Sequence, residues 1–315
     1  MALVVAMLSL AAVAADEYPT KAIRLIAPVP PGSPPDVVAR IIGEQLSKEL
    51  GHPVVVENRP GGNQTIGLGL VATAKPDGYT LGMVSLPTAV VPNLVAKMPY
   101  DTLRDLAPVR ELAWTSNVLV VRGDSPITSL QGLIAAAKAD PGKISFASGG
   151  NGTPAHVMAE LFKAQTNVDL LHVPFKGALE GINAVLGGHV DLMFASAGAV
   201  MSDVRAGKLR ALAQTTATRL PGFPEVETFA ELGFQDIAVR DWQGIVAPAG
   251  TPQSVLNRLA SAMRTVLDRT EVRDRLRNLA MEVVEDSGPA QFAEFVGAEL
   301  RRWAGVAHAA GMRAE

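Results

Sequence analysis

Two loops in the sequence join an apolar run to a helical pattern, and both are rich in proline or glycine. The first loop (28–35) follows the run Ile23–Ala27 and leads to Asp36, a residue type that favours a helix N-cap. The second loop (148–152) contains three glycines, with Thr153 as the expected N-cap and Pro154 at the first helical position. Such junctions point backbone N–H groups and the positive end of a helix dipole at one place. Each loop is a candidate anion site, and an ordinary capped turn is the alternative.

Three further side chains extend this candidate site. His156 falls in the first turn of the helix after the second loop, where the helix dipole disfavours the imidazolium, so we expect a neutral ring. A histidine that only packs and caps is the alternative. Ser85 and Thr88 follow the predicted strand 79–84, at the end where open α/β sheets gather their ligands. Two such loops predict two lobes that face each other across a ligand cleft.

The sequence contains none of the catalytic motifs that would indicate an enzyme. It has no G-x-S-x-G, H-E-x-x-H or P-loop lysine pattern, and no cysteine for a thiol nucleophile, a disulfide or a Cys-ligated zinc. Ser148 and His156 could serve an exported hydrolase as nucleophile and base, but no acidic residue is spaced to orient the histidine. We therefore predict no enzyme, no cofactor and no metal site. His172 lies in a strand-like run, so we expect it in the core.

Composition indicates a globular, exported chain. A length of 315 residues is enough for two α/β domains, and a composition of 48% hydrophobic and 19% charged residues is typical of a globular protein. The net charge of −3 argues against a nucleic-acid partner. Residues 1–15 are apolar and end in small residues, which predicts a secretory signal peptide, although no Lys or Arg precedes the apolar region. No other stretch resembles a membrane span.

The elements that position the two loops alternate between strand and helix. An amphipathic helix is predicted over 37–50, followed by the strand Val54–Asn58, and a second alternating unit spans 129–214. The glycine-rich segment 59–65 is either a wall of the cleft or a mobile surface loop. Helices near the C-terminus, the last over 289–307, suggest that the chain returns to cover its first unit.

Several long motifs resemble the Bug family, the periplasmic solute-binding proteins of tripartite tricarboxylate transporters. They are YPTKAIRLIAPVPPG, VVVENRPGG, KPDGYTL, DPGKISFASGGNGTPAH, HVPFKG and GIVAPAGTP. The resemblance implies a two-lobed α/β fold of the type II periplasmic-binding-protein class, with a mostly parallel sheet and flanking helices in each lobe. The implied division is a signal peptide at 1–15, one lobe from 16–118 and 242–315, and a second lobe from 119–241.

The same resemblance implies a function and a binding site. A monomer in the periplasm would capture a small organic carboxylate between its lobes and deliver it to the transporter's membrane subunits; a periplasmic sensor for a receptor kinase is the alternative. Matching motif positions implies ligand-binding roles for Val29, Pro31, Gly32, Ser33, Ser148, Gly149, Asn151, Gly152, Thr153, His156, Ala195 and Ser196.

The first loop departs from the family pattern. Ser33 stands where a second glycine is usual, Pro34 where serine or glycine is usual, and Pro35 where threonine is usual. The two prolines remove backbone N–H donors from the loop. Val29 replaces a common phenylalanine, a change that would widen the cleft. Ala195 replaces an aspartate found in many members, and its absence argues against a ligand with an amino group.

Overall fold

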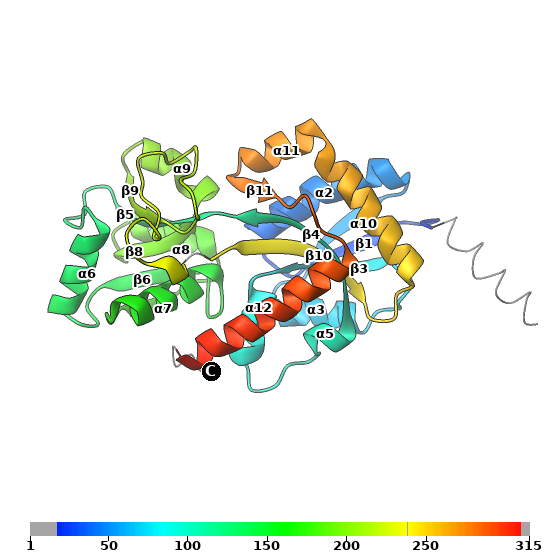
Figure 1. Ribbon diagram of the computed structural model, residues 1–315, viewed down its shortest axis with the longest axis horizontal. Helices are drawn as coiled ribbons and strands as arrows, with labels where there is room; N and C mark the ends of the chain where they lie inside the picture. Colours follow the sequence, from blue (N-terminus) through cyan, green and yellow to red (C-terminus); the bar gives the residue numbers. More distant parts are fainter. Residues whose placement is uncertain (1–17, 238, 310–315) are drawn as a thin grey trace, which may run out of the picture.

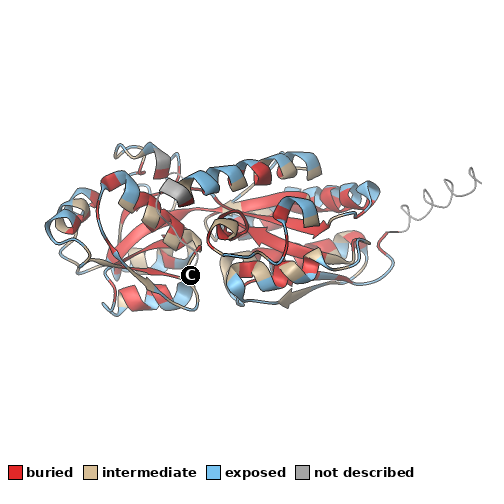
Figure 2. Ribbon diagram, turned by 90° about the horizontal axis from the view of Figure 1, so that it is seen from below, coloured by how far each residue is buried: buried red, intermediate tan, exposed pale blue. Residues whose placement is uncertain are grey.

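The computed structural model describes residues 18–237 and 239–309, so the signal peptide predicted at 1–15 lies outside the described residues. Figure 1 shows two lobes side by side, each built from a sheet with helices around it. Buried residues fill the interior of both lobes, and the helices turn their exposed faces outward (Figure 2). Among the described helices, none combines the length and apolar character needed to cross a bilayer.

The first sheet has six strands in the order β11-β4-β10-β3-β1-β2. β1 pairs in parallel with β2 and β3, whereas β10 runs antiparallel between β3 and β4, and β11 lies antiparallel to β4. The strands are β1 (Ile23–Ala27), β2 (Val54–Asn58), β3 (Thr80–Ser85), β4 (Leu106–Thr115), β10 (Asp241–Pro248) and β11 (Met281–Val283).

The second sheet has five strands in the order β7-β6-β8-β5-β9. β6 pairs in parallel with β7 and β8, and β5 runs antiparallel to β8 and β9. The strands are β5 (Asn117–Arg122), β6 (Ser145–Ser148), β7 (Leu171–Pro174), β8 (Leu192–Ser196) and β9 (Leu209–Gln214).

Both sheets are mixed, which corrects the expectation of mostly parallel sheets. Strands of the alternating units run toward the region between the lobes and end there in loops. β5 enters from the other lobe directly after β4, with only Ser116 between them, and β10 also starts in this region. A strand that begins at a crossing, as β5 and β10 do, runs away from the cleft and so lies antiparallel to its neighbours.

Helices cover the faces of both sheets. Around the first sheet lie α2 (Pro34–Leu50), α3 (Thr65–Ala72), α4 (Pro87–Val90), α5 (Thr102–Asp105), α10 (Gln253–Asp268), α11 (Thr270–Arg277) and α12 (Pro289–Ala309). Around the second sheet lie α6 (Leu130–Ala139), α7 (Pro154–Thr166), α8 (Ala178–Leu186) and α9 (Ala197–Arg205). Short 3-10 turns are η1 (Gly62–Gln64), η2 (Val91–Asn93) and η3 (Gln235–Ile237).

The last helix returns across the first lobe, as the sequence predicted. Trp242 on β10 is fully buried and meets the rings of Phe292 and Phe295 edge-on, at centroid distances of 5.9 and 5.5 Å. Its indole Nε1 donates to the Oε2 of Glu299 at 3.1 Å. A Cβ on Gly244 would collide with Phe292, so residues 242 and 244 both face α12. Residues 241 and 243 therefore face the opposite side of the strand.

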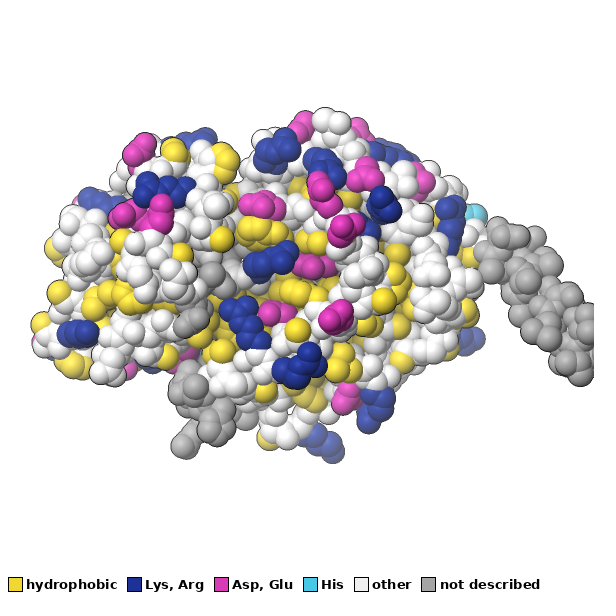
Figure 3. Space-filling view, in the orientation of Figure 1, with side chains coloured by type: hydrophobic (Ala, Val, Ile, Leu, Met, Phe, Trp, Pro, Cys, Tyr) yellow, Lys and Arg dark blue, Asp and Glu magenta, His cyan; other side chains and the backbone are white. Residues whose placement is uncertain are grey.

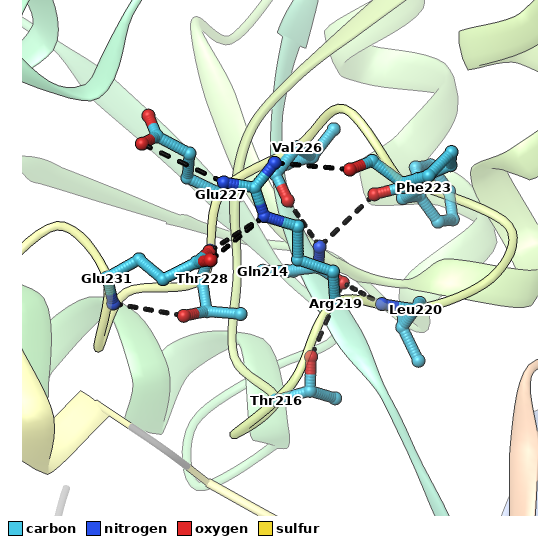
Figure 4. A network of polar contacts seen from close by, with 10 residues as sticks. Gln214, Thr216, Arg219, Leu220, Phe223, Val226, Glu227, Thr228 and Glu231 are labelled. Carbon is cyan, nitrogen blue, oxygen red and sulfur yellow. Dashed lines mark hydrogen bonds and ion pairs between the residues drawn. The ribbon is translucent and has the colours of Figure 1, made fainter.

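The segment between β9 and β10 is organised around one buried amide (Figure 4). The Oε1 of Gln214 accepts hydrogen bonds from the Leu220 N–H at 2.9 Å and the Thr216 hydroxyl at 3.3 Å. Its Nε2 donates to the carbonyl oxygens of Phe223 and Val226. Because Gln214 is fully buried, these bonds satisfy an amide that would otherwise be costly to bury. The chain is thereby folded back toward the start of β10.

On the face shown in Figure 3, Lys and Arg side chains are interspersed with Asp and Glu. Over the described residues, many charged side chains form ion pairs at short range, such as Arg24 with Glu57 at 2.9 Å. Exposed pairs of this kind contribute little to stability, so the fold depends mainly on its two buried cores.

Candidate functional site

A cavity of about 360 Å³ lies between the two lobes, and residues from both of them line it. Six residues predicted for the site lie on its wall: Val29, Ser33, Ser85, Gly149, Thr153 and Ser196. Eight others are not on the wall: Pro31, Gly32, Thr88, Ser148, Asn151, Gly152, His156 and Ala195. Most of this second set supports the residues that do line the cavity. That any of these residues binds a ligand stays a prediction.

The first loop offers an anion fewer backbone donors than its sequence suggested. α2 begins at Pro34 with Ser33 in the N-cap position, so Asp36 lies inside the first turn and its N-cap assignment was wrong. Two prolines in that turn supply no N–H groups, and the Gly32 N–H donates to the Asp36 carboxylate at 2.8 Å. This loop therefore presents an apolar wall to the cavity.

The second loop is hydrogen-bonded to itself. The Gly150 N–H donates to the Ser148 hydroxyl at 3.0 Å, and the Thr153 N–H donates to the Gly150 carbonyl at 3.3 Å. Thr153 occupies the N-cap position and Pro154 the first position of α7, as predicted, but the Thr153 hydroxyl donates to Gly150 at 2.7 Å and makes no cap bond. The loop is a rigid support for the start of α7.

Helix N-termini of the second lobe provide the positive potential at the cavity. Ala155 and Ala178 line it from the first turns of α7 and α8, where backbone N–H groups have no acceptor within the helix. Ser196, which directly precedes α9, lines it as well. Lys176, an exposed residue beside α8, adds a full positive charge. This side of the cavity suits an anion.

The histidines stand behind this wall. Burial lowers the pKa of His156 to about 4, with a smaller effect from Lys163, so its ring is neutral as predicted. Its Nδ1 accepts the Gly152 N–H at 3.1 Å and its ring stacks on His172 at 4.4 Å. His172 was expected in the core but is half-buried, and its Nε2 lies 2.6 Å from the Ser148 hydroxyl.

These contacts do not form the nucleophile and base of a hydrolase. The Ser148 hydroxyl contacts His172 and the Gly150 carbonyl, whereas the Nδ1 of His156 accepts a backbone N–H. Ser148 is also fully buried, so its oxygen cannot reach a substrate in this conformation. The Ser148–His156 pairing considered from the sequence is therefore not present.

The glycine-rich segment 59–65 contributes Pro60, Gly61, Gly62, Asn63 and Gln64 to the cavity wall, as the first of its two interpretations predicted. Gln64, a buried residue of this segment, donates from Nε2 to the Ser85 hydroxyl at 2.6 Å and accepts from the Thr88 hydroxyl at 3.3 Å. Asn63 and Gln64 both adopt left-handed backbone angles, with φ of 48° and 80°. Such strain in non-glycine residues concentrates at functional sites. Sequence reasoning considered the whole segment as a cleft wall but did not single out Gln64, because no motif signals a buried amide contributed by a loop.

Asn63 also joins the two lobes. Its Nδ2 donates to the carbonyl oxygen of Asn151 in the second loop, across the cavity. We expect Asn63→Gly to weaken ligand affinity between two- and tenfold, because a single neutral hydrogen bond contributes about 0.5–1.5 kcal/mol. Glycine tolerates the left-handed backbone, so the loop should keep its shape.

Isothermal titration calorimetry with an acid that binds the wild type would measure this change in affinity. Asn167→Gly is the matched control, since Asn167 is also left-handed, with φ of 53°, but caps the far end of α7. Equal affinities in Asn63→Gly and the wild type would contradict a role for this contact in holding the lobes together.

One acidic residue faces this otherwise neutral and positive site. Asp241, the first residue of β10, lines the cavity and is only 6% exposed. Burial raises the pKa of its carboxyl to about 7. Lys176 and Asp241 are the two charged residues on the cavity wall among the described residues. Sequence reasoning missed Asp241, because its position depends on where β10 crosses between the lobes.

Comparisons with known proteins agree with this architecture. The profile of the tripartite tricarboxylate transporter family receptor (TctC) matches residues 38–312. The chain is 36% identical to the protein BugT of Bordetella pertussis over 305 residues, covering 96% of this chain and 93% of BugT.

Two solved structures are similar over nearly the whole chain. One is an R. palustris protein with adipate, with a TM-score of 0.87 and 31% identity, covering 93% of this chain and 98% of that one. The other is MatC from Rhodopseudomonas palustris with bound malate, with a TM-score of 0.84 and 30% identity, covering 92% and 99%. The two-lobed fold is therefore that of the periplasmic binding proteins. The chain belongs to the Bug family of tripartite tricarboxylate transporter receptors.

Proposed function

We propose that this solute-binding protein works in the periplasm, captures a small organic carboxylate between its lobes and delivers it to the membrane subunits of a tripartite transporter. The observation that carries the proposal is the meeting of the α7 and α8 N-termini with Lys176 at one side of the cavity. Similar structures with adipate and malate support a carboxylate as the ligand.

A carboxylate on this side would accept N–H groups from the first turns of both helices and lie near the Lys176 ammonium. Bonds from such donors to an ionised acceptor are stronger than neutral hydrogen bonds. The first loop, with Pro34 and Pro35 at the cavity, would pack against the carbon chain of the ligand. A ligand held by both lobes stabilises the arrangement in which they are close, by the difference in its contacts between the two states.

The proposal also covers the lobe boundaries and the delivery of the ligand to the membrane subunits. We propose a monomer whose lobes comprise 16–118 with 242–315, and 119–241. The closed pair of lobes would offer the membrane subunits a surface that the open pair lacks. Thermal unfolding with and without mono-, di- and tricarboxylates, aromatic acids and amino acids is the first test, because a ligand that binds only the folded protein raises its melting temperature with dose.

Gly149→Ala should weaken binding of a stabilising acid at least tenfold. A Cβ at this position would lie 3.1 Å from the Ala178 nitrogen and would crowd the N–H groups at the start of α8. Gly305→Ala is the matched control, because a Cβ there meets no atom within 4 Å. Isothermal titration would compare the dissociation constants. Unchanged affinity in Gly149→Ala would contradict binding at the α8 N-terminus, and no binding of any acid would contradict the proposed function.

A further inference from the structure

The carboxylate of Asp241 has no partner in the part of the chain that the structure describes. No hydrogen bond or ion pair reaches its side chain, although its backbone carbonyl accepts one from the Gln243 amide at 3.2 Å. The alternation of β10 directs Trp242 toward α12, so Asp241 points to the other side, where it lines the cavity. Being only 6% exposed, it is also largely withdrawn from water.

An isolated buried carboxylate is costly unless a cation or hydrogen-bond donors compensate it. The nearby Gln243 amide cannot do so, because its Nε2 donates to the Thr115 hydroxyl at 2.8 Å and to the Asp241 backbone. Lys176 also lines the cavity, beside the start of α8, but no ion pair joins it to Asp241. No side chain of the described residues compensates the ionised carboxylate, which leaves the ligand as the source of a compensating group.

We propose that the ligand is a zwitterionic amino acid, whose ammonium pairs with Asp241 while its carboxylate lies at the N-termini of α7 and α8. This rests on the proposed function and specifies its ligand class. The cavity wall carries one positive and one negative side chain, so a zwitterion matches its charges. A dicarboxylate would place its second negative group near Asp241, and like charges at such distances repel strongly in a buried site.

This assignment revises the expectation drawn from Ala195. That residue lies on β8 and is buried behind the wall, so its lack of a carboxylate does not leave the site without one. Asp241 supplies the acidic group from a different strand. A ligand hydroxyl could also donate a hydrogen bond to Asp241, but it would leave the buried negative charge uncompensated. An ammonium supplies both the hydrogen bond and the positive charge.

Isothermal titration of the full chain with matched probes tests the proposal. The amino acids are alanine, 4-aminobutanoate and 6-aminohexanoate. Lactate, 4-hydroxybutanoate and 6-hydroxyhexanoate replace the ammonium by a hydroxyl, and succinate and adipate replace the aminomethyl end by a carboxylate. We expect at least one amino acid to bind tenfold or more tightly than its counterparts.

Asp241→Asn should then weaken the binding of that amino acid at least tenfold without weakening the binding of the dicarboxylates. Asp140→Asn is the matched control, since Asp140 is exposed and pairs with Lys143 at the end of α6. The comparison among probes in the wild type needs no variant, so it decides the question even if Asp241→Asn fails to fold.

Two results would overturn the inference alone: a dicarboxylate or hydroxy acid that binds the wild type as tightly as its amino acid, or an amino acid whose affinity Asp241→Asn leaves unchanged. In either case carboxylate binding, and with it the proposed function, would survive. Failure of every probe to bind would contradict the inference. The proposed function would be contradicted as well only if the tricarboxylates and aromatic acids of the thermal-unfolding test also failed to bind.

Discussion

Asp241→Asn is expected to raise the free energy of unfolding by about 4 kcal/mol at pH 8, while leaving it nearly unchanged at pH 4. The folded protein holds the pKa of Asp241 at about 7 because the group is buried, against an ordinary value of 3.8. A carboxyl whose pKa is raised by folding binds its proton more tightly in the folded state. Its contribution is therefore fully favourable below the unfolded pKa and is lost as pH rises through 7.

Asparagine cannot ionise, so the variant should lack this loss. Urea unfolding at pH 4, 6 and 8 would measure the difference between variant and wild type, which should grow with pH. Glu111, whose pKa burial also raises to about 7, is present in both proteins and cancels from the comparison. If the free energies of unfolding of the two proteins differed by the same amount at every pH, burial would not be raising the pKa of Asp241.

Together with the ligand experiment, this result would separate two roles of one residue. In the free protein the Asp241 carboxylate would lower stability, and in the complex it would strengthen binding of the ammonium. Such a residue serves ligand binding and not folding. Stabilising substitutions that cost function are a common consequence of such sites. The variant should be the more stable protein and the weaker amino-acid receptor.

Local patterns predicted the elements that stand next to the cavity. β1 was predicted with its observed bounds, and α2 and α12 differ from the prediction only near their ends. The start of α2 was misplaced because Asp36 is a strong capping residue in isolation, whereas the two prolines before it already fit the first helical turn. Periodicity and capping act within a few residues, and at that range they were informative.

The parts of the site that escaped prediction depend on contacts between distant segments. Ser148 pairs with His172, which is brought beside it by the parallel pairing of β6 and β7. Asp241 reaches the cavity because β10 crosses between lobes, and Gln64 because its loop folds over β3. Neither residue carries a local signal of its position. The crossing strands also explain why the sheets are mixed, since βαβ alternation alone predicts parallel pairing.

Gly198→Ala is expected to weaken ligand binding tenfold or more by holding the lobes apart. Gly198 lies in the first turn of α9, in the second lobe, and a Cβ there would fall 2.2 Å from the carbonyl oxygen of Leu279. Leu279 precedes β11 of the first sheet, so this contact joins the two lobes. Both groups are tied to the backbone, so no rotation of a side chain can relieve the collision. Overpacking of this kind costs about 1–3 kcal/mol, which separating the lobes would avoid.

The contact lies beside one of the crossings between the lobes. The carbonyl of Ser116, the residue between β4 and β5, accepts the Ala197 N–H at 2.9 Å, and the Ser116 N–H donates to Ala280 at 3.5 Å. In the proposed closure the lobes would pivot about their crossings, so a displacement there would be magnified at the cavity. Small-angle X-ray scattering should show a larger radius of gyration for Gly198→Ala with saturating acid than for the wild type.

Gly222→Ala provides the control for this experiment. Its Cβ would lie 2.7 Å from the terminal methyl of Met201, also on α9, but that methyl is the end of a flexible side chain and can turn away. Affinity and scattering of this variant should match the wild type. If Gly198→Ala bound ligand normally and kept the wild-type radius, the approach of Leu279 would not limit how far the lobes close. A loss confined to Gly198→Ala would instead support a limit on closure set by backbone contact at the crossing.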